Sequence, residues 1–381
     1  MKGYLYLANS TKSGASKKEM TLTNMSLAGI KAANELGYKS WIGVDLGIEK
    51  LNSPHDVSFF NVGVYRNPLA FRDNRKAYKT LVKEIRKNSI DFIHCNTPVG
   101  GILGRLAGKK CKVKKVIYQV HGFHFYKGAP KRNWMLYYPV EKWLAHHTDA
   151  LITINREDFE FAKKKIKLRG GGKVYYVPGV GIDTADYAPN EQIRASKREE
   201  LGFSDELFYI VSAGRLEHNK NNATLIKAVT HSNNKRLRLV LCGDGVQREE
   251  LKTLAKELDI EEQVIFLGNR SDMREIYLAV DAFAMASYRE GLSRTIMEAM
   301  SSGLPCTVSK IRGNVDLVED GKGGYLYSPA DYAGFAEAFN KLSCDSELRR
   351  AMSEYNLEYI KSFDSDVVRK ELKKIYEDVL N

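Results

Sequence analysis

The chain has 381 residues, of which 43% are hydrophobic, enough for the cores of two domains of ordinary size. No apolar run approaches the roughly 18 residues of a membrane span, and the apolar stretch in MKGYLYLANS is too short for a signal peptide, so we expect a cytosolic protein. The five cysteines show no metal-type pairing, which favours reduced and mostly buried thiols.

The net charge of +12 is unevenly divided along the chain. Residues 1–190 carry a net charge of +17, and residues 191–381 carry −5. A basic half can serve nucleic acid, anionic lipid or a phosphorylated substrate, and charge alone does not choose among them.

Short β-rich runs alternate with helical stretches along the whole chain. In the first half we predict strands at 4–9, 40–44, 91–95, 116–121 and 150–154. The second half repeats the rhythm at 208–214, 237–243, 264–268, 281–286 and 305–309. This alternation is typical of parallel sheets covered on both faces, so we predict an α/β protein with two doubly wound, Rossmann-like domains. In such sheets, ligands bind at the carboxyl ends of the strands.

The domain boundaries follow from composition. Proline and glycine cluster at 177–192, so we predict a first domain at 1–185 and a second at 186–362. The segment 363–381 contains an amphipathic helical pattern at 363–380.

The basic half contains one informative stretch, in which cations interleave with aromatic residues between Arg105 and Trp143. The candidates that we single out are Lys109, Lys112, Lys127, Lys131, Arg132 and Trp134. Cations beside aromatic residues favour a lipid interface, so we hypothesise docking on the anionic inner leaflet of the membrane. The alternative is a soluble basic surface with buried aromatic residues.

Two motifs of the second half suggest a phosphate site. Arg215 and Lys220 lie five positions apart after a predicted strand, and two cations there would suit a diphosphate. Glu290 begins a loop that leads into a predicted helix at 294–302, and Glu298 lies inside that helix. A helix start can hold an anion, and ionised carboxylates can accept bonds from hydroxyl groups. The spacing therefore suggests a phosphate ligand flanked by sugar hydroxyls.

Simpler interpretations stand beside these. A pair of glutamates eight positions apart is most often ordinary helix surface, and the GDG at 243–245 is most often a turn. His121 and His124 form an HxH pattern without a third ligand, so we expect no metal site.

Together these motifs resemble a known family. The GRLxxxKN run at 214–221, the two glutamates, and the AMxxGLP run at 299–305 are similar to those of family-4 retaining glycosyltransferases with the GT-B fold. Supporting matches are CGDG (242–245), FLGNR (266–270), VEDGKGGYLYSPAD (318–331) and VPGVGID (177–183). The stretch from His121 to Asn155 looks most like bacterial enzymes that build capsule or exopolysaccharide repeat units.

The resemblance implies roles for single residues of the second domain. Arg215 and Lys220 match the pair that holds the donor diphosphate, Glu298 the acceptor of ribose hydroxyls, and Glu290 the acceptor of donor-sugar hydroxyls. The backbone of Gly291, Leu292 and Ser293 matches the loop at the distal phosphate and sugar. The segment with Asn269, Arg270 and Met273 matches the one that reads the base, usually uracil.

In the first domain, His121 matches a histidine near the reacting carbon, and Gly14 stands where the family has a Gly-Gly loop. The resemblance also implies that the C-terminal helix crosses back onto the first domain. The catalytic candidates are thus His121, Glu290, Arg215 and Lys220.

The function that these expectations describe is transfer of a hexose or N-acetylhexosamine from a UDP-sugar to a polyisoprenyl-diphosphate-linked glycan, without a metal or other cofactor. Arg215, Lys220 and the helix start would stabilise the charge that grows on the departing phosphate, as a metal does in other transferases. We expect an enzyme on the inner face of the cytoplasmic membrane that does not bind nucleic acid. The alternatives are a nucleotide-sugar epimerase of the same architecture, and a basic protein that binds nucleic acid or membrane.

Overall fold

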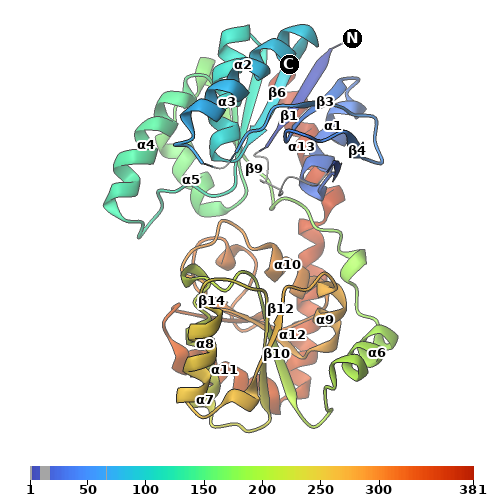
Figure 1. Cartoon of the computed structure of the whole chain (residues 1–381), viewed down its shortest axis with the longest axis vertical. Coiled ribbons are helices and arrows are strands. Elements are labelled where there is room, and N and C mark those ends of the chain that lie inside the picture. Colours follow the sequence, from blue (N-terminus) through green and yellow to red (C-terminus); the bar gives the residue numbers. More distant parts are fainter. Residues whose placement is uncertain (1, 9–17, 66) are drawn as a thin grey trace. The chain divides into compact units, whose positions relative to one another are not determined.

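The computed structural model describes residues 2–8, 18–65 and 67–381, and it divides into two compact units (Figure 1). Unit 1 comprises Met1–Gly181 together with Ser365–Asn381, and unit 2 comprises Ile182–Asp364. The chain therefore crosses between the units at 181–182 and at 364–365, a few residues from the junctions expected from composition. The two crossings run side by side, because Ile182 and Asp364 form a parallel bridge.

Unit 1 is built on a parallel sheet. Among its described residues, seven strands pair in the order β5-β3-β1-β6-β7-β8-β9, and β2 pairs with β4. The strands are β1 (Gly3–Leu7), β2 (Glu19–Thr21), β3 (Lys39–Val44), β4 (Lys50–Asn52), β5 (Ser58–Asn61), β6 (Ile90–Asn96), β7 (Lys115–Val120), β8 (Ala150–Thr153) and β9 (Lys173–Tyr176). The five predicted strands are thus confirmed as β1, β3, β6, β7 and β8, whereas the edge strands β5 and β9 and the pair β2-β4 were not predicted.

Helices cover both faces of this sheet. They are α1 (Asn24–Glu35), α2 (Phe71–Lys87), α3 (Pro98–Cys111), α4 (Lys131–Ala145), α5 (Arg156–Lys165) and α13 (Ser365–Leu380). Successive side chains of a strand point to opposite faces. Leu5 and Leu7 of β1 accordingly join the core under α2 and α3, and Tyr4 and Tyr6 join the core under α1 and α13. Figure 1 shows α4 on the outer side of α3.

The last helix, α13, completes the second of these cores. Its buried residues are Val368, Leu372, Ile375, Tyr376 and Val379, which follow the spacing of one helix face. This face packs on α1 and on the sheet, so the amphipathic pattern seen at 363–380 is buried within unit 1.

Unit 2 repeats the architecture. Its described strands form a parallel sheet in the order β12-β11-β10-β13-β14-β15. They are β10 (Phe208–Ala213), β11 (Leu237–Cys242), β12 (Val264–Gly268), β13 (Ala282–Met285), β14 (Cys306–Ser309) and β15 (Gly324–Tyr327). All five strands predicted here are confirmed, and only the edge strand β15 was missed. All six residues of β10 are buried, which explains its continuous apolar run at the centre of the sheet.

The helices of unit 2 are α6 (Glu191–Leu201), α7 (Asn222–Ser232), α8 (Arg248–Glu257), α9 (Met273–Ala279), α10 (Arg294–Ser301), α11 (Tyr332–Cys344) and α12 (Ser346–Tyr359). The predicted helix at 294–302 is α10, and Gly303 just beyond it has a φ of +75°, the left-handed conformation that commonly ends a helix. Loops that follow β10, β13 and β14 lie at one edge of this sheet, since parallel strands share their carboxyl ends.

Candidate functional site

Two loops at the carboxyl edge of the unit 2 sheet are tied together. The Tyr288 N–H donates to the carbonyl of Asn219 (2.9 Å), and the Asn219 side chain donates to the carbonyl of Arg289 (3.0 Å). At the next position of each loop, Lys220 Nζ lies 2.8 Å from Glu290 Oε1. The sequence-predicted cation and carboxylate therefore meet in space, although they come from loops after different strands.

Lys220 also packs against backbone. Gly214, at the end of β10, has a φ of +147°, and a Cβ placed there would lie 3.3 Å from Lys220 Cε. Arg215, by contrast, is directed to solvent, with 81% of its side chain exposed, and its ion pair with Glu217 is long at 3.9 Å. Lys220 and Arg215, the two cations predicted to bind phosphate, thus differ. The Lys220 side chain is held in place, whereas the Arg215 side chain is free to reorient toward a ligand.

A third loop, after β14, supports the Glu290 segment and was missed in the sequence. The buried Arg312 donates through Nε to the Glu290 carbonyl at 3.4 Å. Gly313 has a φ of +81°, and a Cβ there would lie 2.3 Å from the Gly291 carbonyl oxygen. This close approach leaves room only for glycine, so the backbone from Glu290 to Leu292 rests directly on the β14 loop.

The loop ends at Ser293, which precedes α10. Ser293 is buried, and its hydroxyl bonds to Thr295 Oγ1 (3.1 Å) and contacts Met285 Sδ (3.9 Å) rather than capping the helix. The first-turn N–H groups of α10 therefore receive no bond from the Ser293 side chain. The first turn of a helix presents such N–H groups to an anion. Gly291 and Leu292 are partly exposed in the loop just before them.

Glu298 lies one turn into α10 and is 9% exposed. Its Oε1 accepts from Arg294 Nε (2.9 Å) and Tyr187 Oη (3.1 Å), and its Oε2 accepts from Tyr277 Oη (3.2 Å). Burial, and then the charge of Glu298, raise the pKa of Tyr277, which therefore remains a donor. The carboxylate is thus fixed by three donors, none of which was singled out in the sequence.

The predicted base-reading segment follows β12. Asn269 is exposed, and Met273 begins α9. Arg270 Nε donates to Asp272 (2.8 Å), which also binds Lys197 Nζ (2.9 Å). The Arg270 hydrogen bond holds the pKa of Asp272 well below its usual range. The Arg270 charge is therefore engaged within the protein, whereas the side chains of Asn269 and Ser271 in this segment are exposed.

In unit 1, His121 directly follows β7. Its Nε2 atom is buried and has no hydrogen-bond partner among the described residues. Burial lowers the pKa of His121 to about 4, so the imidazole is neutral at physiological pH. Gly14, the candidate for the glycine loop, lies outside the described residues.

Trp134, one of the residues predicted to face the membrane, is partly buried: it packs on Phe125, Tyr138 and Phe161, against the core. The exposed apolar residues of α4 are instead Met135 (77%), Leu136 (63%), Tyr137 (39%), Val140 (41%) and Trp143 (53%). The sequence could not separate these positions, because aromatic residues occur on both faces of the helix.

The five cations singled out in this stretch are exposed. Lys127, Lys131 and Arg132 lie at or just before the start of α4. Lys109 belongs to α3, but its Nζ contacts His147 Nε2 (3.0 Å) just beyond the C-terminal end of α4. Lys112 directly follows α3. The exposed apolar stripe of α4 therefore has positive charge at both ends.

A buried ion pair fixes the orientation of α4. Arg105 of α3 is 1% exposed and donates to both oxygens of Glu141 on α4 (2.8 and 3.2 Å). Its Nε donates to the Gly101 carbonyl (2.9 Å), and its guanidinium lies 3.9 Å from the centre of the Tyr118 ring. The charged groups are thus satisfied, and the Glu141 face of α4 is directed inward.

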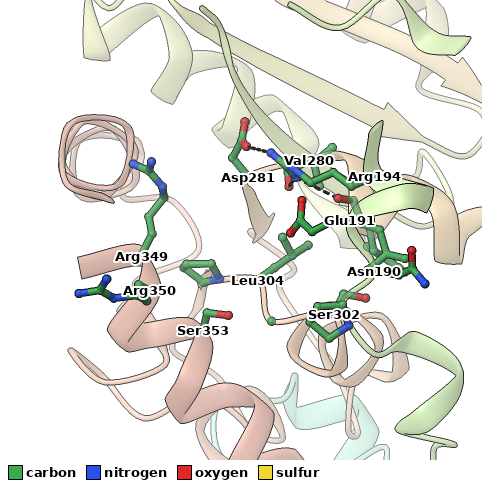
Figure 2. Close-up of a pocket in the computed structure, with 15 residues that line it drawn as sticks. Asn190, Glu191, Arg194, Val280, Asp281, Ser302, Leu304, Arg349, Arg350 and Ser353 are labelled. Atoms are coloured by element: carbon green, nitrogen blue, oxygen red, sulfur yellow. Dashed lines mark hydrogen bonds and ion pairs between the residues drawn. The ribbon is translucent and has the colours of Figure 1, made fainter. Parts of the chain in front are cut away.

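A cavity of about 250 Å³ in unit 2 has Tyr277 in its lining, but not Lys220, Glu290 or Glu298 (Figure 2). Asp281 and Pro305, which line it, directly precede β13 and β14, so the cavity is at the amino edge of the sheet. Figure 2 shows Arg194 joined to Asp281, a bond of 2.6 Å. None of the sequence-predicted site residues lines this cavity.

In residues 2–8, 18–65 and 67–381, no group of three or more His, Cys, Asp or Glu side chains is arranged to hold a metal ion. None of the helices in these ranges combines the length and the apolar character required to span a bilayer.

Family models match both halves of the chain. The model described as glycosyl transferases group 1 matches residues 193–359, and the model described as glycosyl transferase 4-like matches residues 60–155. A relative from Bacillus subtilis (strain 168), which bears the name "Putative glycosyltransferase EpsD", is 37% identical over 322 residues, covering 83% of this chain and 84% of EpsD. The UDP-Gal:alpha-D-GlcNAc-diphosphoundecaprenol alpha-1,3-galactosyltransferase of Escherichia coli is 29% identical over 328 residues, covering 85% and 84%.

Solved structures share the fold. HepE of Anabaena in complex with UDP-glucose superimposes with a TM-score of 0.78 at 19% identity, covering 99% of this chain and 100% of that one. WaaG, a glycosyltransferase involved in lipopolysaccharide biosynthesis, has a TM-score of 0.70 at 16% identity, covering 98% and 99%.

Proposed function

Because the chain belongs to the group 1 glycosyltransferases and has the GT-B fold, we propose that it is a retaining enzyme that transfers a hexose or N-acetylhexosamine from a UDP-sugar to a polyisoprenyl-diphosphate-linked glycan. The product would be a repeat unit of capsule, exopolysaccharide or O-antigen. The name of the E. coli relative supports this donor and acceptor class. The observation that carries the proposal is the Lys220–Glu290 pair at the carboxyl edge of the unit 2 sheet.

The donor site would work by charge. When the bond between the anomeric carbon and the UDP oxygen breaks, negative charge grows on the diphosphate, and Lys220, Arg215 and the start of α10 can stabilise it. We propose that these groups suffice without a metal ion. Glu290 accepts hydrogen bonds from the donor-sugar hydroxyls, and Glu298 accepts them from the ribose hydroxyls.

The same charges suit a retaining reaction. The acceptor hydroxyl attacks the face that the diphosphate leaves, a bond forms between its oxygen and the anomeric carbon, and its proton passes to the departing phosphate oxygen. His121 would contact the donor sugar as a neutral imidazole, since a protonated ring would repel the positive charge that develops on that sugar. If Glu290 were instead a covalent nucleophile, a glycosyl adduct on Glu290 could be trapped.

We also propose that the protein meets its acceptor at a membrane surface, which α4 would bind. The stripe Leu136, Val140 and Trp143 lies on one side of α4, with cations at both ends of the helix. Apolar side chains can enter the lipid interface, and each cation near an anionic surface contributes about 1 kcal/mol. We propose that α4 binds the inner leaflet of the cytoplasmic membrane, where a polyisoprenyl-linked acceptor resides.

The test is UDP release from a panel of UDP-sugars in the presence of EDTA, with and without a membrane lipid extract. We expect lipid-dependent release from one sugar, and at least about tenfold slower release in Lys220→Ala and in Glu298→Ala. Lys227→Ala, which removes an exposed lysine of α7, is the matched control and should behave as wild type. Release that does not depend on an acceptor would favour an epimerase, and full activity of both site variants would refute the proposed site.

A further inference from the structure

Glu298 is buried and has few acceptor sites left for a ligand. A carboxylate can accept about four hydrogen bonds, about two on each oxygen. Oε1 already accepts from Arg294 Nε (2.9 Å) and Tyr187 Oη (3.1 Å), and Oε2 accepts from Tyr277 Oη (3.2 Å). The described residues thus fill Oε1 and leave room for a further bond only on Oε2. The ribose of a nucleoside presents two neighbouring hydroxyls, so Glu298 can accept from both only if one of its present donors leaves.

Arg294 is the donor best able to leave. Its side chain is 49% exposed, whereas Tyr277 is buried and Tyr187 is half-buried. An ion pair between helix residues four positions apart, with one partner half-exposed, adds little to stability. Burial tends to lower the pKa of Arg294, but the charge of Glu298 raises it overall, so the guanidinium stays charged. The side chain that leaves is therefore a cation, and it needs a new anionic partner.

The position of Arg294 gives it such a partner when a phosphate is bound. Arg294 begins α10, in the turn whose N–H groups receive no bond from the Ser293 side chain. Residues 294–297 include no acidic side chain, so the positive end of the helix dipole disfavours a cation here, and a bound anion would reverse that effect. A guanidinium can donate two parallel bonds to phosphate oxygens, which suits it to a diphosphate at this helix start.

We propose that Arg294 is a nucleotide-binding residue that exchanges partners: it leaves Glu298 Oε1 when the ribose hydroxyls bind, and its guanidinium then binds the diphosphate. This inference rests on the UDP-sugar site proposed above and adds a residue to that site. The exchange makes recognition of the two parts of the nucleotide interdependent, because the ribose opens the ion pair and the diphosphate takes up the released charge. A nucleoside without phosphates leaves the arginine without an anion and therefore binds poorly.

The experiment compares uridine with UDP as ligands of the full chain. Calorimetry measures the affinity for UDP, and ligand-observed NMR measures the weaker affinity for uridine. In Arg294→Met, UDP should bind about tenfold more weakly, because the diphosphate loses a charged donor. Uridine should bind about threefold more tightly, because Glu298 Oε1 is open to its hydroxyls from the start. A damaged fold would weaken both ligands, so changes in opposite directions report the exchange itself.

Two further variants separate the exchange from a general effect of charge. Arg236→Met is the matched control, since Arg236 is an exposed arginine directly before β11, at the amino edge of the same sheet. Both of its affinities should stay within about twofold of wild type. Arg294→Lys keeps a cation that can reach the phosphate, so it should retain more of the preference for UDP over uridine than Arg294→Met does.

The outcomes that contradict the exchange are specific. Equal weakening of UDP and uridine binding in Arg294→Met would mean that Arg294 only holds Glu298 in place. An unchanged affinity for uridine would mean that Glu298 accepts both hydroxyls with Arg294 still bound. Either result would overturn the inference while leaving the donor site intact. A wild-type protein that bound no UDP would instead refute the donor site itself, so the two failures are distinguishable.

Discussion

Lys220 Nζ lies 2.8 Å from Glu290 Oε1, although the two residues are 70 positions apart in the chain. Both side chains are mostly buried, with 21% and 14% exposed. A charge in such a place is stabilised by an opposite charge, so each residue neutralises the other before any ligand binds. A diphosphate that approached Lys220 would compete with Glu290 and leave the carboxylate available to sugar hydroxyls.

This pairing predicts strong coupling between the two residues. Lys220→Met should lower kcat/KM about 100-fold, because the diphosphate loses its anchored cation. Glu290→Gln alone should also impair turnover. The double variant should be less impaired than the sum of the two effects, by about 1 kcal/mol or more, because each single variant leaves a charge unpaired. Steady-state UDP release measures all three, and strictly additive effects would contradict the pairing.

Glu298 offers a different prediction. Because three donors already fix this carboxylate, Glu298→Gln places an amide N–H or a weaker acceptor against Tyr187, Tyr277 and Arg294. We expect about a tenfold weaker affinity for UDP, with kcat changed less than about threefold, since ribose contacts act before the chemical step. Calorimetric titration with UDP is the measurement. An unchanged affinity would remove Glu298 from the nucleotide site.

The Arg105–Glu141 pair should be a stability determinant. Glu141→Ala leaves the Arg105 charge buried without a partner, and such losses cost about 3–5 kcal/mol. The double variant Arg105→Met with Glu141→Leu should recover most of this loss, because it removes both charges together. Urea unfolding of the three proteins tests the idea. A double variant as unstable as Glu141→Ala would show that packing, rather than the unpaired charge, is responsible.

Membrane binding should depend on the exposed face of α4. Leu136→Ser with Trp143→Ser should reduce sedimentation with anionic liposomes several-fold, and raising the salt concentration should weaken binding of the wild type. Trp134 is excluded from this test because it is partly buried and packs on Phe161. Val246→Ser, at an apolar position of unit 2 that is 93% exposed, is the control. Failure of the wild type to sediment at low salt would refute docking.

His94 and His121 predict a pH dependence of stability. Their folded-state pKa values, about 3 for His94 and about 4 for His121, lie below the usual value of about 6.5. The unfolded chain therefore binds protons first as the pH falls, so this stability is fully present above pH 6.5 and is lost toward pH 4 and 3. At pH 5 each histidine should lower the free energy of unfolding by about 2 kcal/mol relative to pH 7. Urea unfolding of His94→Gln should show a smaller decline than wild type between pH 6.5 and 5, and an equal decline would contradict the assignment.

The sequence predicted the central strands and two Rossmann-like domains because long buried runs such as Phe208–Ala213 have a clear pattern. The GT-B fold was predicted from the resemblance of the motifs to a known family. It missed β5, β9 and β15, which are short edge strands with partly exposed residues. Such strands are defined by pairing with a neighbour, which local composition does not record.

The same distinction holds for the candidate site. Lys220 and Glu290 stood out because each is part of a short charged motif, Lys220 with Arg215 and Glu290 with Glu298. Tyr277 and Arg312 did not, since a tyrosine on a short helix and an arginine in a loop have many ordinary uses. Their roles arise from contacts with Glu298 and with the Glu290 carbonyl, which only the folded chain brings together. Trp134 and Trp143 could not be told apart in the sequence, although the first is partly buried against the core and the second is 53% exposed.

Residues 182–364 are inserted into unit 1, whose last helix follows them in the chain. During synthesis, Tyr4, Ile42 and Phe92 must therefore wait for α13 to cover them. At about 5–20 residues per second, the wait after residue 181 lasts about 10–40 s. A nascent chain thus carries a sheet face that α1 covers without α13 while the inserted unit is being made.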